Sequence, residues 1–224
     1  MNLVVVAVVL TLAGAGISFH PSFAGTAWMW AAFPLLQAPL AILSLARLKK
    51  SGALQDMLQP KWGDISLGMI SALVLLAASW AIRSVAAPEG SPREAWLFRA
   101  YLQAGDPRVL QDRWPLVALG IVAIASLTEL AWRGLVLPRL EEKLGSRRAW
   151  PAAGLLYGLC FAPSAWWLRD QAGINVLILL AATSGGLVWS FLAVRSQRLV
   201  PSMMSHGVFL WFVVVQFRVL TLGT

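Results

Sequence analysis

Seven long apolar runs limit what this chain can fold into. They cover residues 1–19, 28–46, 65–82, 115–138, 149–167, 171–194 and 199–220. A helix needs about 20 mostly apolar residues to cross a bilayer. None of the runs alternates as a membrane barrel strand does, and a helix satisfies its own backbone polar groups in lipid. The sequence therefore predicts an all-α fold, a polytopic transmembrane helix bundle of about seven spans.

The composition excludes an ordinary soluble protein. Charged residues make up 12% of the chain, whereas soluble domains contain about 25%. A net charge of +8 would suggest nucleic-acid binding in a soluble protein, but here Lys and Arg lie mostly in loops beside apolar runs, as in membrane proteins. We expect an integral membrane protein that contacts membrane lipid and binds no nucleic acid. The single cysteine, Cys160, excludes a cysteine-cluster metal site, and no cofactor or metal is predicted.

Two long loops lie between the predicted spans. Residues 47–64 and 83–114 mix large apolar side chains with charges, which short helices on the membrane surface would explain. For the first loop an ordinary polar loop explains the pattern equally well. We expect residues 1–114 to form N-terminal transmembrane helices with membrane-surface loops, and residues 115–217 to complete one compact bundle.

The basic residues predict an orientation. Ten Lys and Arg residues lie on the side that includes Arg47 and Arg139, and seven, including Arg218, lie on the other. Loops rich in Lys and Arg stay in the cytoplasm. The N-terminus lacks the positive segment of a secretory signal and is expected to be a first span. We therefore predict a cytoplasmic N-terminus.

The stretch "TELAWRG" places Glu129 and Arg133 inside the fourth run. A charge at mid-bilayer costs about 2.5–3.5 kcal/mol on insertion scales, and such residues favour a functional site. Residues four apart on a helix share a face, so these two can pair. A structural ion pair and a functional site are both open on position alone.

His206 is the other ionisable residue well inside a run. At about 1.5 Å per residue, Glu129 lies roughly 15 Å from Arg139 and His206 roughly 12 Å from Arg198 along their helices. Both reference arginines belong to the same predicted side. The two groups are therefore expected at similar depth, where a carboxylate and an imidazole could perform acid–base chemistry.

Three stretches in the second half of the chain resemble a known family. They are "TELAWRGLVLPRLEEKLG", "AAGLLYGLCFAP" and "GLVWSFLAVRSQRLVPSMMSHGVFL", which are similar to the E-E-x-x-x-R, F-x-x-x-H and H-x-x-x-N motifs of the CAAX protease and bacteriocin-processing family (CPBP, or Abi). The resemblance implies an intramembrane endopeptidase of a bacterial inner (plasma) membrane, acting on membrane-anchored or peptide substrates. It assigns Glu129, Arg133 and His206 as the catalytic positions that this chain keeps.

Three other motif positions differ. Thr128 stands for the first Glu, Phe161 for the middle His and Leu210 for the Asn. By the resemblance, the lost groups would activate water, assist proton transfer and stabilise an oxyanion. Loss of one oxyanion donor costs about 10²–10³ in rate, and catalytic groups act as a unit.

Three hypotheses follow. The favoured one is a catalytically impaired member that binds a membrane-anchored protein or peptide in the former cavity. The second is an active endopeptidase in which Glu129 serves as base and His206 as acid. A transporter ranks last, because the sequence shows no paired broken helices in corresponding halves.

Overall fold

The computed structural model describes residues 3–216, so Arg218 and the end of the seventh run lie outside the described residues. The described chain contains helices and no strand. Its α-helices are α1 (Leu3–Ser18), α2 (Ala27–Lys50), α3 (Leu54–Leu58), α4 (Asp64–Ala86), α5 (Ala95–Ala104), α6 (Pro107–Asp112), α7 (Trp114–Ala131), α8 (Leu137–Leu144), α9 (Ser146–Leu159), α10 (Ala162–Trp167), α11 (Val176–Ser196) and α12 (Val200–Trp211). Short helical segments are η1 (Pro21–Phe23), η2 (Pro92–Glu94), η3 (Trp132–Val136) and η4 (Phe212–Gln216).

Each of the seven apolar runs corresponds to a helix or a pair of helices. Within residues 3–216, four helices are long and apolar enough to cross a membrane, namely α2, α4, α11 and the continuous helix formed by α7, η3 and α8. The apolar helices α1 and α12 are shorter. The predicted all-α polytopic bundle is thus confirmed.

The fifth apolar run, 149–167, forms two helices, and the break lies beside Pro163, which interrupts this run in the sequence. α9 ends at Leu159 and α10 begins at Ala162, with Cys160 and Phe161 between them. Pro163 lies in the first turn of α10. Proline lacks a backbone N–H and clashes with the preceding turn, so it is favoured in the first turn of a helix, as in α10, although α2 continues through Pro34 and Pro39.

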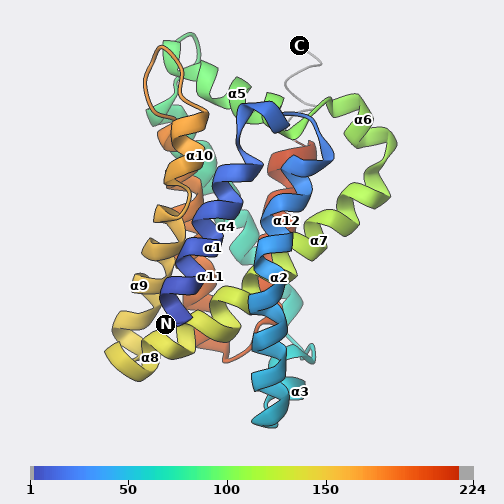
Figure 1. The fold of residues 1–224 in the computed structure, drawn as a ribbon, viewed down its shortest axis with the longest axis vertical. Coiled ribbons are helices and arrows are strands. Elements are labelled where there is room, and N and C mark those ends of the chain that lie inside the picture. The colour runs from blue at the N-terminus through green and yellow to red at the C-terminus, as the bar shows by residue number, and fades with distance from the viewer. Residues whose placement is uncertain (1–2, 217–224) are drawn as a thin grey trace.

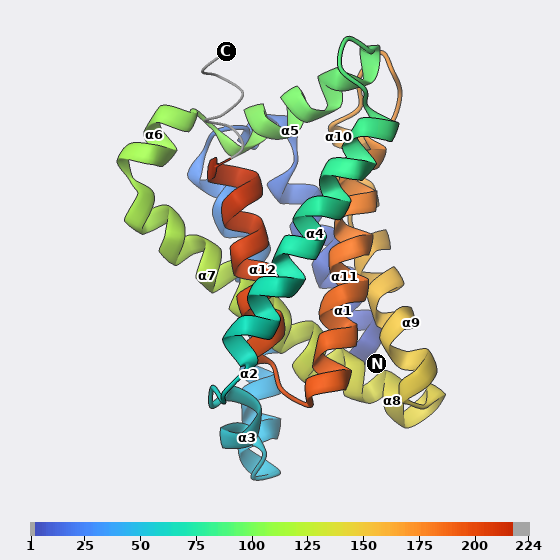
Figure 2. The same ribbon diagram turned by 180° about the vertical axis from the view of Figure 1, so that it is seen from behind.

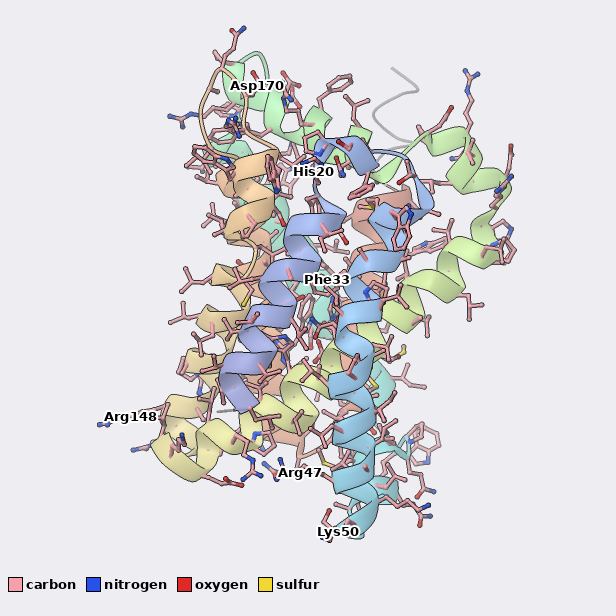
Figure 3. The ribbon with its side chains drawn as sticks, in the orientation of Figure 1. His20, Phe33, Arg47, Lys50, Arg148 and Asp170 are labelled. Carbon is pink, nitrogen blue, oxygen red and sulfur yellow. The ribbon has the colours of Figure 1, made fainter. Side chains whose placement is uncertain are left out.

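The long helices run roughly along one direction and alternate in sense (Figures 1 and 2). The N-terminal end of α1, the short helix α3 and α8 lie at one end of the bundle, and α5 and α6 lie across the opposite end. Figure 3 shows Arg47, Lys50 and Arg148 at the first end, called the basic end below, and His20 and Asp170 at the other. This separation follows the division of basic residues used to predict the orientation; the orientation itself stays a prediction.

Both long loops contain short helices, as predicted for the second loop and as one of the two interpretations left open for the first. α3 lies in the first, and α5 and α6 lie in the second. Polar contacts hold α5 across the bundle: Gln103 Nε2 donates to the carbonyls of Ser18 (2.8 Å) and His20 (3.0 Å), and Arg99 Nε lies 2.5 Å from Asp170 Oδ2. α5 therefore connects the ends of α1 and α10. Contact of these helices with lipid stays a prediction.

Glycines let α9 and α11 cross very closely. A Cβ on Gly154 would lie 2.7 Å from the backbone of Leu187, and one on Gly186 would lie 2.6 Å from the carbonyl oxygen of Gly154. Small residues at such crossings are typical of membrane helices. One consequence is that the backbone of α11 near Gly186 comes within reach of side chains in the bundle interior.

Candidate functional site

The three ionisable residues singled out in the sequence meet inside the bundle. Glu129 Oε1 lies 3.3 Å from Arg133 Nη1 and 2.9 Å from His206 Nδ1. Glu129 is 0% exposed, Arg133 1% and His206 3%. The predicted pairing of Glu129 with Arg133 and the predicted meeting with His206 are both confirmed as geometry. We call these three residues the buried centre.

The pair does not lie on one regular α-helix. Glu129 belongs to α7, whereas Arg133 lies in η3, a π-helical turn that continues α7. Such turns insert one residue into a helix and frequently mark functional sites. In η3, Gly134 lies directly against Ser44 of α2, and a side chain there would meet that hydroxyl. The π-turn thus places Arg133 in the interior while α2 packs against η3.

Arg133 is held from several directions. Its Nη2 donates to the carbonyl oxygen of Gly186 at 2.9 Å, a contact that the close crossing of α9 and α11 allows. Its guanidinium carbon lies 5.0 Å from the ring centre of Tyr157 and 5.7 Å from that of Trp189. Cations over aromatic faces are stabilised by the ring quadrupole, more strongly when desolvated. These contacts help to offset the cost of burying the guanidinium.

His206 is fixed by an aromatic neighbour on α11. The Trp189 ring stacks on the imidazole with a centroid separation of 3.7 Å and an interplanar angle of 14°. Trp189 Nε1 in turn donates to Ser205 Oγ at 3.2 Å. The imidazole therefore has an indole on one face and the Glu129 carboxylate at Nδ1, which leaves it little freedom to turn.

Some polar atoms at the buried centre have no partner within residues 3–216. They are Glu129 Oε2 and Arg133 Nε. Buried polar groups are normally hydrogen-bonded, so these two atoms are an unsatisfied acceptor and an unsatisfied donor in the bundle interior. Among the same residues, no group of three or more His, Cys, Asp or Glu side chains could hold a metal ion.

The three residues that differ from the family motifs, Thr128, Phe161 and Leu210, lie within the helix bundle. Thr128, which is 0% exposed, donates its hydroxyl to the carbonyl of Ile124 one turn earlier, at 2.7 Å. The Phe161 ring packs 5.3 Å from Tyr157 and 5.7 Å from Phe33. Leu210 lies half-buried on α12, one turn beyond His206. The Phe161 and Leu210 side chains carry no proton donor or acceptor, and the Thr128 hydroxyl, which cannot replace a carboxylate base, is already bonded to Ile124.

Sequence reasoning did not find the groups that enclose the buried centre. Trp189, Tyr157 and the carbonyl of Gly186 were not singled out, although they contact His206 or Arg133. The signal for the last was available. Two adjacent glycines inside an apolar run, opposite Gly154 and Gly158, indicate a close helix crossing.

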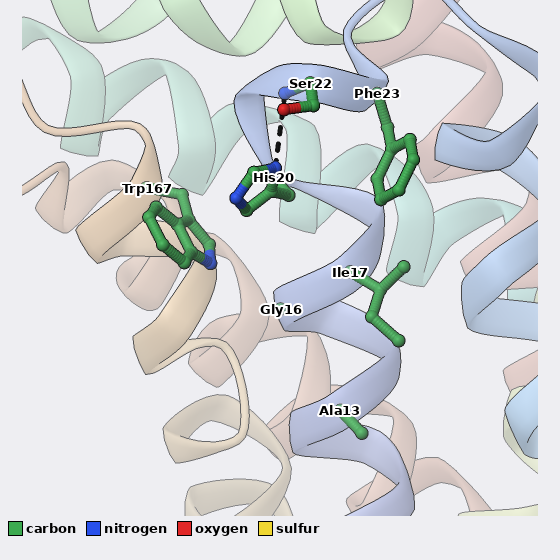
Figure 4. Close-up of a pocket in the computed structure, with 7 residues that line it drawn as sticks. All are labelled: Ala13, Gly16, Ile17, His20, Ser22, Phe23 and Trp167. Atoms are coloured by element: carbon green, nitrogen blue, oxygen red, sulfur yellow. Dashed lines mark hydrogen bonds between the residues drawn. The ribbon is translucent and has the colours of Figure 1, made fainter.

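An apolar pocket lies away from the buried centre, near the end opposite the basic end. Figure 4 shows its lining, which comes from α1, η1 and α10: Ala13, Gly16, Ile17, His20, Ser22, Phe23 and Trp167. His20 packs edge-on against Trp167 at 4.5 Å and accepts a hydrogen bond from the Ser22 backbone through Nδ1. Its only ionisable group is thus engaged in local packing, and the pocket offers no second group for chemistry.

Comparison with known proteins agrees with the resemblance predicted from the motifs. Residues 110–212 match the family model described as Rce1-like, type II CAAX prenyl endopeptidase Rce1-like. The match is wider than the three motif stretches and includes α7 through α12. No curated protein and no solved structure matches the chain.

Proposed function

From the match of residues 110–212 to the Rce1-like model of type II CAAX prenyl endopeptidases, we propose that this integral membrane protein is a catalytically impaired member of that family. In this proposal it binds a membrane-anchored protein or peptide and does not cleave it. We further propose that it resides in a bacterial inner membrane with its N-terminus in the cytoplasm.

The observation that carries the proposal is the hydrogen bonding and burial of Thr128. Its hydroxyl is committed to the carbonyl of Ile124 and is completely buried. Unlike a carboxylate, a threonine hydroxyl does not accept a proton from water at neutral pH. The residue at the motif position that would activate water therefore forms a hydrogen bond within its own helix instead. Phe161 and Leu210 remove the other two polar groups from the same motifs.

The contacts of Glu129 also favour a structural role. Its carboxylate has Arg133 on one side and His206 on the other, so its charge is balanced and its position fixed by two other segments, η3 and α12. Buried ion pairs of this kind can specify one packing arrangement, even where they add little net stability. In this proposal the helix bundle keeps its packing, whereas the motif positions Thr128, Phe161 and Leu210 lack the groups needed for hydrolysis. This combination favours a function that depends on binding.

Photo-crosslinking in cells tests partner binding. A photoreactive residue at Leu210, half-buried beside the buried centre, should capture a discrete membrane protein or peptide that is recovered intact. The same residue at Ile70, which is 59% exposed on α4, is the matched control for contacts made by chance in the bilayer. Equal capture from both positions, or lipid adducts alone, would contradict a partner at this site.

A second function, endopeptidase activity, is favoured by one observation. His206 Nδ1 lies 2.9 Å from Glu129 Oε1, while Glu129 Oε2 has no partner among the described residues. A carboxylate oxygen beside an imidazole could orient a water molecule. In that case Glu129 would act as base and His206 as acid, and cleavage of a membrane-anchored substrate would depend on both.

A further inference from the structure

The charges of the molecule are distributed unequally between its two ends. The segments at the basic end, residues 47–64, 139–148 and 195–198, contain ten basic and four acidic residues. At the opposite end, residues 83–113 and 169–171 contain six basic and five acidic residues. Trp62, between Lys61 and the start of α4, is fully exposed. Exposed tryptophan beside lysine is typical of the lipid headgroup region.

Two arginines at the basic end have buried nitrogens without partners. Arg47 Nη1 and Arg198 Nη1 are inaccessible to solvent, and neither has a hydrogen-bond partner within residues 3–216. A guanidinium stays charged in proteins, so an unsatisfied buried N–H costs more here than in a neutral group. Three of the four acidic residues at this end are already paired: Asp64 with Nη2 of Arg198, which leaves its Nη1 unpartnered, Asp56 with Lys61 and Glu142 with Arg139. Arg47 forms no ion pair with a described residue.

The two arginines belong to neighbouring segments. Arg47 precedes Leu48 in the last turn of α2, and Arg198 precedes Leu199 in the connection from α11 to α12. Leu48 and Leu199 pack in one apolar cluster. Figure 3 shows Arg47 on the side of α2 turned toward α8, whereas Lys50 lies at the tip of the helix. α12 begins at Val200, two residues after Arg198, and no described side chain caps its N-terminus; helix N-termini favour anions.

We propose that Arg47 and Arg198 bind the phosphate of an anionic phospholipid headgroup at the basic end. The planar guanidinium suits phosphate oxygens, which can accept two parallel hydrogen bonds. The bound lipid would connect α2 with the α11–α12 connection. This inference does not depend on whether the protein cleaves or binds a peptide.

Lipid titration of the purified full-length protein tests the proposal. Dissociation constants are measured in detergent by native mass spectrometry for short-chain phosphatidylglycerol, phosphatidylcholine and inorganic phosphate. Wild type should prefer phosphatidylglycerol to phosphatidylcholine and should not be saturated by phosphate at the same concentration. Arg47→Gln should weaken phosphatidylglycerol binding about tenfold or more, as expected for a lost charge-assisted hydrogen bond.

Two control variants separate a defined site from a general positive field. Lys50→Gln removes an exposed charge at the same end and should weaken binding by about fivefold at most. Arg108→Gln removes an exposed charge at the opposite end and should have no effect. Arg47→Lys, which keeps the charge without the planar fork, should bind between wild type and Arg47→Gln and gives a second folded variant. Equal losses for Arg47→Gln and Lys50→Gln, no preference for the anionic lipid, or saturation by inorganic phosphate alone would each overturn the proposal.

Discussion

His206 Nδ1 and Glu129 Oε1 lie 2.9 Å apart although 77 positions separate the residues along the chain. This contact joins α12 to α7 in the middle of the bundle, and Arg133 and Trp189 complete the enclosure. The same arrangement can hold a bundle together or orient a water molecule. The contacts of Thr128 and Phe161 favour the structural role.

The buried ion pair should contribute to stability. Glu129→Gln leaves Arg133 with an uncompensated charge at a fully buried position, and loss of one partner of a buried pair typically costs about 3–5 kcal/mol. The variant should therefore unfold at a lower temperature and accumulate less in membranes. Glu142→Gln removes the same charge from an exposed pair with Arg139 and should cost about 1 kcal/mol or less. If Glu129→Gln is as stable as wild type but loses biological activity, the result would instead support the endopeptidase function.

The crossing of α9 and α11 should tolerate no added methyl group. A Cβ at Gly186 would lie 2.6 Å from the Gly154 carbonyl oxygen, so Gly186→Ala must push the helices apart and weaken the hydrogen bond from Arg133. Overpacking of this kind typically costs about 1–3 kcal/mol. Gly120→Ala on α7 is the matched control, because nothing lies within 4 Å of its Cβ and alanine favours a helix by up to about 1 kcal/mol. Thermal unfolding of both variants in one detergent measures the difference; equal effects would contradict the close crossing.

Acid should weaken the attachment of α5. A hydrogen bond from Arg99 and one from the Gln171 backbone hold the pKa of Asp170 below its usual value. A lowered folded-state pKa stabilises the fold at pH values above the unfolded pKa of about 3.9. That contribution is lost as the pH falls through the folded pKa.

Amide hydrogen exchange in α5 measures this effect. After correction for the intrinsic rate, it should accelerate between pH 5 and pH 3, about one unit on either side of the unfolded pKa. Asp170→Asn should exchange faster at pH 5 and show a smaller acid response; an equal response in both proteins would show that this contact does not secure the helix.

Reporter fusions test the predicted orientation. A fusion after Lys50 should report the cytoplasm and a fusion after Arg99 the opposite side, because these positions lie at opposite ends of the bundle and the basic end should stay inside. Matched expression of both fusions controls for insertion efficiency. Both reporters on one side would refute the bundle's placement in the membrane, and an exchange of sides would refute the cytoplasmic N-terminus.

The sequence was sufficient to predict which ionisable residues lie at the same depth in the bundle. Counting 1.5 Å per residue from flanking arginines placed Glu129 and His206 at similar levels, and they do meet. It was insufficient for Gly186 and Trp189, because a helix carbonyl becomes a partner only where two backbones cross closely, and side-chain stacking depends on helix rotation. Apolar content also could not reveal the π-turn at Arg133, since a local change of hydrogen-bond register leaves the periodicity of surrounding residues almost unchanged.

The break between α9 and α10 illustrates the same limit for the fold. The run 149–167 is apolar throughout much of its length, but Pro163 and the turn at Cys160 divide it into two helices. Composition predicts that a segment prefers lipid or core, and Pro163 indicates an interruption of this run. α2 nevertheless continues through Pro34 and Pro39, so a proline alone does not show where a helix ends. Phe161 lies at this break, where it packs against Tyr157 and takes the place that the motif gives to histidine.

A cleavage assay tests the central claim, loss of hydrolysis, most directly. Purified wild type and His206→Ala are incubated in lipid with membrane-anchored and prenylated peptide substrates, and products are followed by mass spectrometry. Because Thr128, Phe161 and Leu210 supply no base, imidazole or oxyanion donor, we predict that wild type releases no more product than His206→Ala. Product formed by wild type and absent from a folded His206→Ala variant would contradict the account and assign the buried centre to catalysis.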